Sequence, residues 1–382
     1  LQTPGWPLTL AAAFSLSSAS LYATAKAVML GVFVLSCAAM GSLTIGLTRS
    51  TAAGLLVTAG WMLHPLTHKG FEDASNYAMG LLMTVLAVAA ILNAIRRLTW
   101  GAAFLAGFVI ALAGTVKSYH LVLALPAMVA IVLAGDGDFR ERAVRLGAFA
   151  VAGIVGALPV LVPLGMEPTS VWYQNLGFHA DNVAWSQEVG LTRGIGAKGK
   201  LSALGELLSM PATIILTLVL VIVALWSHRL TRNPFPRPVG VLLAMLIAAG
   251  LASFAPSPIY HQYWAFPTML AFLTLAGWLG ALDNEQHRTL VAGIAAAAVG
   301  AVGLLGMQEY LGPLDDDTIT AVEMQDRIVS RLRPLADQLP DECKVGTLAP
   351  ATALDAGFDI YPEMATGTFL WNVIDVSSPR DT

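Results

Sequence analysis

Ten stretches of apolar residues alternate with short polar segments along this chain. Continuous runs of this kind are typical of membrane-spanning helices, whereas strands of a membrane barrel alternate apolar and polar residues over about 10 positions. The pattern predicts an all-α polytopic membrane protein with about ten transmembrane helices. The expected spans are 27–47, 52–65, 75–95, 100–116, 119–134, 146–165, 210–227, 239–255, 261–280 and 289–307.

Arginine residues fall almost entirely into every second gap between these spans. By the positive-inside rule, gaps rich in arginine face the cytoplasm. The remaining gaps are therefore expected to face outward, and binding or catalytic residues should be sought there. The arginines that set this orientation are Arg49, Arg96, Arg97, Arg140, Arg142, Arg145, Arg229, Arg232, Arg237 and Arg288.

The same pattern divides the chain into three parts. Residues 1–26 are apolar but interrupted by serines, which predicts an amphipathic segment on the outer face of the membrane. Residues 27–307 form the transmembrane helical domain, whose longest outer loop, 166–209, has mixed polarity. Residues 308–382 are expected to form a soluble extracytoplasmic C-terminal domain.

The C-terminal part combines a helix pattern with a strand pattern. Residues 315–335 have apolar positions spaced for one face of an amphipathic helix, and 343–348 read as a short strand. This combination predicts the start of a small α/β domain that the chain cuts off. Because the sequence begins with Leu1 rather than Met, we expect it to be a fragment of a longer protein.

The composition agrees with a membrane location and excludes other classes. Of the 382 residues, 56% are hydrophobic and 12% are charged, against about 25% charged in soluble globular domains. The formal net charge is −4, and from Glu309 onward there are fourteen acidic and five basic residues, so we expect no nucleic-acid partner. Cys37 lies in an expected span and Cys343 in the tail, so the two are not expected to form a disulfide.

The middle of every expected span lacks Asp, Glu, Lys and Arg. Transporters that keep charges at the bilayer centre use them for ion or proton coupling. Here the ionisable residues collect at the outer ends of the spans instead. That placement suits an isoprenoid lipid carrying a phosphate and a sugar, since the lipid tail stays in the bilayer while the head group reacts at its rim.

Glu72 and Asp73 form an acidic pair at the outer entrance of the span 75–95. A carboxylate at this position is often an N-terminal cap of the helix, which is one interpretation. In the other interpretation, one carboxylate orients an acceptor hydroxyl or binds a hard divalent cation such as Mg²⁺ or Mn²⁺. Asp73 is the candidate metal ligand.

Lys117 and His120 lie close together in sequence at the outer turn between two short spans. A lysine there can extend to the lipid head groups without any further role. Alternatively, its ammonium group neutralises a lipid phosphate, which gains negative charge as it leaves. Arg193, in the loop 166–209, also has two interpretations: it binds a phosphate, or it is only a surface charge.

Tyr260, His261 and Gln262 begin a polar and aromatic segment at the outer mouth of the span 261–280. Tyrosines at this depth commonly belong to an aromatic belt. In the other interpretation, the imidazole of His261 and the amide of Gln262 make this segment a substrate-binding site. His179 and Asp181 have metal-ligand spacing, but no third ligand follows at a convincing spacing.

Taken together, three segments resemble the type C glycosyltransferase superfamily, which includes the protein O-mannosyltransferases and the lipid A aminoarabinose transferases. The segments are Gly70-Phe71-Glu72-Asp73-Ala74-Ser75, the run 107–117, and Tyr260-His261-Gln262-Tyr263-Trp264-Ala265-Phe266-Pro267. The resemblance implies an enzyme of the plasma or inner membrane. It would transfer a sugar from a polyprenyl-phosphate donor to a hydroxyl of an acceptor glycan, lipid or protein on the extracytoplasmic side.

The resemblance also implies roles for individual residues. Asp73 matches the second acidic position of the family, near the metal or the acceptor, and we group Glu72 with it as catalytic. Lys117 and His261 fall where phosphate ligands are expected, and we assign His120, Tyr260, Gln262 and Arg193 to the same substrate-binding set. The usual catalytic base of the family is an Asp in a first outer loop, after a first helix, and neither appears in this sequence; a fragment that starts near the end of that loop would have lost the base.

Two other functions stay open. A polytopic transporter or lipid flippase would have discontinuous helices with polar residues at mid-membrane and often an internal repeat. A non-catalytic membrane subunit of an envelope assembly is the third alternative.

Overall fold

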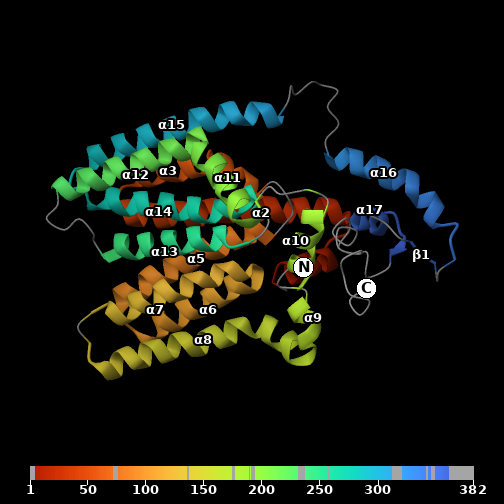
Figure 1. Ribbon diagram of the computed structural model, residues 1–382, viewed down its shortest axis with the longest axis horizontal. Helices are drawn as coiled ribbons and strands as arrows, with labels where there is room; N and C mark the ends of the chain where they lie inside the picture. The colour runs from red at the N-terminus through yellow and green to blue at the C-terminus, as the bar shows by residue number, and fades with distance from the viewer. Residues whose placement is uncertain are drawn as a thin grey trace.

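The structure is a computed structural model. It describes residues 5–71, 76–135, 137–173, 177–188, 190, 194–230, 237–256, 259–311, 321–340, 343–345 and 349–360. Within these ranges the chain is almost entirely helical, and most of its long helices run side by side in one bundle (Figure 1).

Seven helical segments of the described chain are long and apolar enough to cross a membrane. They are α2 (Leu21–Thr48), α5 (Asn76–Arg97), α8 (Phe139–Met166), α12 (Pro211–Leu230), α13 (Arg237–Phe254), α14 (Ala265–Ala281) with the preceding 3₁₀ turn η3 (His261–Trp264), and α15 (Glu285–Leu311). These account for seven of the ten expected spans. The chain is therefore helical and of multi-pass membrane type.

The other three expected spans are shorter apolar helices. They are α3 (Thr51–Met62), α6 (Trp100–Val116), and the 3₁₀ turn η1 (Ser118–Leu123) followed by α7 (Ala124–Leu133). Helix α3 ends early because His64 and Pro65 interrupt the pattern, and α4 (Pro65–Phe71) continues in its place. Whether these short helices also cross the membrane stays a prediction.

The N-terminal part differs in its boundaries from the expected outer segment. Helix α1 (Gly5–Leu16) is followed by α2, which begins at Leu21, six residues before the expected span. The hydroxyl of Ser20 accepts a hydrogen bond from the backbone N–H of Ala23 and caps α2 at this point. Trp6 of α1 is buried in a small apolar cluster with Met29 and Val32 of α2.

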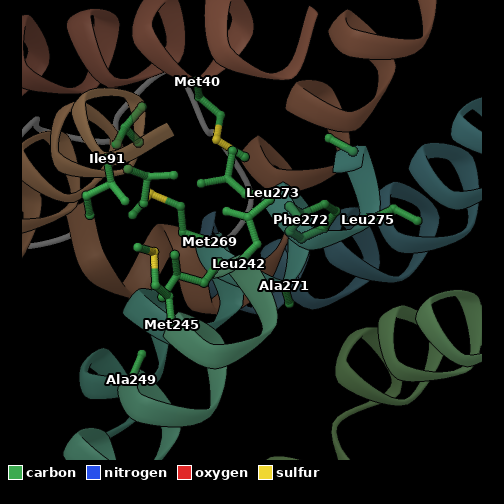
Figure 2. Packing of buried hydrophobic residues seen from close by; sticks show 14 of the residues in the cluster. Met40, Ile91, Leu242, Met245, Ala249, Met269, Ala271, Phe272, Leu273 and Leu275 are labelled. Atoms are coloured by element: carbon green, nitrogen blue, oxygen red, sulfur yellow. The ribbon is translucent and has the colours of Figure 1, made fainter. Parts of the chain in front are cut away.

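Helix α14 lies at the centre of the bundle. Nearly all of its side chains are buried, and Met269, Leu270 and Phe272 are among the least exposed in the protein. Figure 2 shows Met269 close to Leu242 and Met245 of α13, from the neighbouring helix. Apolar side chains on all faces of α14 are the pattern expected of a helix surrounded by protein.

At several places two segments of the bundle approach each other so closely that only glycine fits between them. A Cβ atom at Gly107 of α6 would overlap the carbonyl oxygen of Phe149 in α8, and one at Gly280 of α14 would overlap that of Leu47 in α2. Gly303 of α15 makes the same kind of approach to Leu63 O. Small residues allow this close packing, which replaces the hydrophobic driving force that is missing between helices in lipid.

The helix ends divide into two groups at opposite ends of the bundle. One end carries the arginines of the bundle helices, several of which bind free carbonyls at helix C-termini. Arg288 donates to Leu282 O at 2.6 Å and to Thr48 O at 3.2 Å, and Arg145 donates to Ala134 O at 3.2 Å. These guanidinium groups therefore complete the ends of α14, α2 and α7 as well as supplying positive charge.

The opposite end carries α4, η1, η3 and the smaller elements. Helices α9 (Pro168–Trp172), α10 (Phe178–Glu188) and α11 (Gly196–Ser209) lie in the expected loop 166–209. Figure 1 shows α9 and α10 beyond the same end of the bundle as α16 (Ala321–Ala336) and α17 (Pro350–Asp355).

The described residues of the C-terminal part form α16, β1 (Lys344–Val345), α17 and β2 (Asp359–Ile360), and the two strands pair in parallel. The described part of the predicted helix 315–335 is α16. The carboxylate of Asp355 accepts hydrogen bonds from the backbone N–H groups of Leu21 (2.6 Å) and Tyr22 (3.3 Å). It thus caps α2 from a distant part of the chain and joins the C-terminal part to the bundle. That this part forms a separate extracytoplasmic domain stays a prediction.

Candidate functional site

Three helix ends meet around Lys117. The residue itself is extended (φ −152°, ψ 118°), so α6 stops there and the chain re-enters the bundle through η1. The first turn of α5 contributes Asn76 and Tyr77, and η3 contributes Tyr263. Each of these elements is a helix start or a 3₁₀ turn at the end of the bundle opposite the arginines.

The ammonium group of Lys117 lies among three tyrosine rings. Its Nζ is 3.7 Å from the ring centroid of Tyr77, 5.3 Å from that of Tyr263 and 5.8 Å from that of Tyr119. Lys117 also donates a hydrogen bond to Asn76 Oδ1 at 3.3 Å. We refer to Asn76, Tyr77, Lys117, Tyr119 and Tyr263 as the lysine cage.

Asn76 is fixed in the orientation that the cage requires. Its side-chain nitrogen Nδ2 donates to the carbonyl oxygen of Val116 at 3.2 Å, which leaves Oδ1 for Lys117. Asn76 itself is 2% exposed. The amide therefore links the start of α5 to the end of α6 and holds the lysine between them.

The electrostatic environment of Lys117 favours an anion. Among the described residues no carboxylate forms an ion pair with it, and its contacts are aromatic faces and one amide oxygen. Burial lowers the pKa of Lys117 from 10.5 to about 7. A negatively charged group entering the cage would supply the missing counter-charge and stabilise the ammonium form.

His120 is next to the cage but points into the helix packing. It is 1% exposed, and its Nδ1 shares a hydrogen bond of 2.8 Å with Thr84 Oγ1 of α5. Its ring stacks on Tyr119 with centroids 4.5 Å apart. A Cβ on Gly80 would lie 2.5 Å from His120 Nε2, so this side chain fits only because α5 has a glycine there.

Tyr260, His261 and Gln262 lie at the edge of the cage. Tyr260 is 43% exposed, and its ring is 5.8 Å from that of Tyr263. His261 and Gln262 are half-buried in η3. Gly70 of α4 packs against Ala265, since a Cβ on that glycine would lie 3.1 Å from the alanine methyl group. The segments around residues 70 and 260 therefore lie at the same end of the bundle, as expected.

Some predicted site residues lie outside the described part of the chain. These are Glu72, Asp73 and Arg193. In sequence, the acidic pair precedes the cage residue Asn76 by three and four positions. No group of three His, Cys, Asp or Glu side chains within the described residues is arranged to hold a metal ion. The role of Asp73 as a metal ligand thus stays a prediction.

Three other polar residues of the loop 166–209, Tyr173, Asp181 and Lys200, have hydrogen-bond partners within the protein. Tyr173 Oη donates to Asp181 Oδ2 at 2.9 Å, within the same loop. Lys200 Nζ donates to the carbonyl oxygens of Phe254 (3.2 Å) and Ala255 (2.6 Å) and so caps α13. The first contact joins two segments of the loop, and the contacts of Lys200 join the loop to the end of α13.

Sequence reasoning missed the aromatic part of the cage and one other polar site. Tyr119 follows Lys117 by two residues and Tyr263 follows Tyr260 by one 3₁₀ turn, and that spacing was the available signal. The second missed feature is His64, in the break between α3 and α4. It is 1% exposed, and its Nδ1 accepts a hydrogen bond from the backbone N–H of Leu66 at 3.2 Å.

The break leaves several polar atoms buried. Because His64 Nδ1 is an acceptor, the neutral ring carries its proton on Nε2. That N–H, and the Nε1–H of Trp61, are buried and have no hydrogen-bond acceptor among the described residues. Buried donors of this kind usually pair with a water molecule or a ligand atom.

Comparisons with known proteins give little further information. No family model matches the chain, and no curated protein does. A solved structure of the oligosaccharyltransferase of Archaeoglobus fulgidus in its apo form matches with 14% sequence identity and a TM-score of 0.47. The match covers 89% of this chain and 50% of the archaeal one, so this chain spans about half the length of that protein. A likeness of this degree does not decide the function.

Proposed function

We propose that this protein is a membrane glycosyltransferase that moves a sugar from a polyprenyl-phosphate donor to an acceptor hydroxyl on the extracytoplasmic side. The observation that carries the proposal is the lysine cage. A cation without a carboxylate partner among the described residues lies among aromatic rings, where apolar helices end. A lipid-linked anionic head group has the matching chemistry.

Lys117 would bind the phosphate of the donor. During transfer the bond between the anomeric carbon and the phosphate oxygen breaks, and polyprenyl phosphate leaves with one more negative charge. A fixed cation in a poorly hydrated site stabilises charge that develops in this way. Asn76 holds the ammonium in place, so little rearrangement is needed when the charge appears.

The aromatic and polar residues at the edge of the cage would hold the sugar. Tyr260 offers a half-exposed ring, and His261 and Gln262 offer hydrogen-bonding groups on the same turn. Binding sites commonly combine aromatic walls with a few polar groups that fix orientation. Because His120 is held by Thr84, we now propose that it positions η1 against α5 rather than touching the phosphate.

The acidic pair would act on the acceptor. Glu72 or Asp73 would accept the proton of the acceptor hydroxyl as its oxygen bonds to the anomeric carbon. Asp73 would alternatively bind Mg²⁺ or Mn²⁺ through its carboxylate oxygens. Arg193 is proposed as a further phosphate ligand. In each case the residue would act at the outward-facing end of the bundle.

The test uses the full-length protein and radiolabelled polyprenyl-phosphate sugar. We expect Asp73→Asn and Lys117→Ala each to abolish sugar transfer while membrane insertion is unchanged. Lys198→Ala is the matched control, because Lys198 is an exposed lysine at the same end of the bundle, and it should transfer sugar normally. Unchanged turnover in both site variants would remove these residues from the reaction.

A second candidate function is transport or lipid flipping, which the break between α3 and α4 favours. Discontinuous helices with buried polar groups form the substrate sites of many transporters. If the break serves transport, His64→Leu should stop uptake or flipping in proteoliposomes and leave sugar transfer intact. If instead that variant transports at the normal rate, this candidate loses its structural support.

A further inference from the structure

An apolar groove runs along the outside of the bundle between α7 and α13. It has a volume of about 570 Å³, and Ile95 of α5 closes one side near the arginine-rich end. The lysine cage belongs to η1, η3 and α5 at the opposite end, and none of its residues lines the groove. The groove is therefore a separate feature that the proposed function does not use.

Small residues form the floor of the groove and large ones form its walls. The small residues recur every four positions on both helices, which places them on one face of each. They are Ala130 on α7 and Ala134 directly after its end, and Gly240, Ala244 and Ala248 on α13. Leu125, Leu133 and Leu251 beside them are each more than 60% exposed. The result is an open groove with apolar walls.

The length of the groove suits an extended hydrocarbon chain. Arg237 and Leu251 both line it and are 14 residues apart on α13, which corresponds to about 21 Å along the helix. The hydrocarbon of one leaflet is about 15 Å thick. A single chain lying in the groove would therefore contact protein from the head-group level to beyond the middle of the bilayer.

One end of the groove is positively charged. Arg237 lines it there and is exposed, and no ion pair joins it to a described residue. Arg96 and Arg97 directly follow Ile95 at the end of α5. Arg142 donates to Gly135 O, one residue after the lining residue Ala134. The surrounding guanidinium groups suit a phosphate at this end of the groove.

We propose that this groove binds one acyl chain of an anionic phospholipid from the leaflet at the arginine-rich end, with Arg237 on its phosphate. Hydrophobicity alone would not favour this over bulk lipid, because the bilayer is equally apolar. Charge pairing at the mouth and contact with protein along the chain distinguish the site from the general lipid shell.

The test measures lipid that stays bound to the full-length protein. The protein is reconstituted in nanodiscs of phosphatidylglycerol and phosphatidylcholine, transferred to detergent, and analysed by native mass spectrometry. Gly240→Leu places a side chain in the groove, and the Cβ of that side chain meets nothing within 4 Å. Gly250→Leu is the matched control on the same helix, since Gly250 has equal space but does not line the groove.

We expect Arg237→Ala to lower retained phosphatidylglycerol at least fivefold, since one cation near an anionic lipid contributes a factor of roughly five. Gly240→Leu should lower it at least fivefold too, because the leucine occupies the space of the acyl chain. Gly250→Leu should retain the wild-type amount. Equal retention in all three variants would overturn the proposal. So would recovery of polyprenyl phosphate instead of phospholipid, or a change of oligomeric state in Gly240→Leu that points to a protein occupant. If Gly240→Leu does not fold, the exposed Arg237→Ala decides alone.

Discussion

At the scale of single residues, Lys117 shows how a membrane protein keeps a charge near its apolar region. In one interpretation of the sequence, the side chain of Lys117 extends to the lipid head groups and has no further role. In the structure the ammonium turns inward to Asn76 and the tyrosine rings. Cation–π contacts of this kind contribute about 2 kcal/mol when desolvated, which offsets only part of the burial cost and leaves the site favourable for an anion.

The lowered pKa of Lys117 gives a prediction about pH. The ammonium form dominates below about pH 7 and is lost as the pH rises through that value. A sugar phosphodiester keeps one negative charge throughout this range. We therefore expect the affinity for the lipid donor to fall by up to about tenfold per pH unit above pH 7.

The measurement is equilibrium binding of the lipid donor between pH 6 and pH 9. Lys117→Arg is the control, because a guanidinium stays charged over this range, and its affinity should not vary with pH. If the wild-type affinity were equally flat, Lys117 would not be the group that binds the phosphate.

The candidate site was predictable from the sequence only in part. Lys117, Tyr260 and Gln262 stood out because they lie at the outer ends of apolar runs, where a lipid head group would meet the protein, and the structure places them at one end of the bundle. Asn76 did not stand out, because its role depends on the carbonyl of Val116, 40 residues away in sequence. Long-range contacts of that kind leave no local pattern.

At the scale of helices, the apolar runs predicted the seven long spans well, since length and composition define such helices. The apolar run predicts a single span, 52–65, whereas α3 ends at Met62 and α4 begins at Pro65, because His64 and Pro65 interrupt the run. The helices of the loop 166–209 were not predicted either. Helix α10, for example, has no apolar face that a periodicity could reveal.

Close helix contacts give a prediction with a matched control on one helix. Gly107→Ala in α6 should destabilise the protein by about 1 to 3 kcal/mol, because the new methyl group overlaps Phe149 O in α8. Gly101→Ala, on the same helix, meets nothing within 4 Å and should be neutral or stabilising by up to about 1 kcal/mol. Thermal unfolding in detergent measures both, and equal effects would show that α6 and α8 do not pack this closely.

The cap formed by Asp355 gives a second prediction at this scale. Asp355→Ala removes the acceptor for Leu21 N–H and Tyr22 N–H and should weaken the attachment of the C-terminal part by about 0.5 to 2 kcal/mol. Hydrogen exchange should then become faster in the first turn of α2 and in α17. Asp359→Ala, at an exposed position on β2, is the control and should leave both segments protected; faster exchange there too would argue against a specific cap.

At the scale of the whole molecule, the structure separates two sets of charged groups that the sequence had assigned to opposite sides. Arginines complete the helix ends at one end of the bundle, while the lysine cage and α9 to α11 lie at the other (Figure 1). Because arginines also bind helix carbonyls here, part of their pattern has a structural cause. Sidedness therefore needs a direct test.

We predict that the lysine cage opens on the side away from the cytoplasm. In a background with Cys37 and Cys343 changed to serine, Lys198→Cys reports on the cage end and Glu285→Cys on the arginine-rich end, both at exposed positions. A membrane-impermeant maleimide added to intact cells should label Lys198→Cys, and it should label Glu285→Cys only after permeabilisation. The reverse pattern would place the cage on the cytoplasmic side. The arginine-rich end would then face outward, against the positive-inside rule. Labelling of both in intact cells would mean that the bundle does not span the bilayer along its length, and the cage could not then meet a lipid head group at the outer surface.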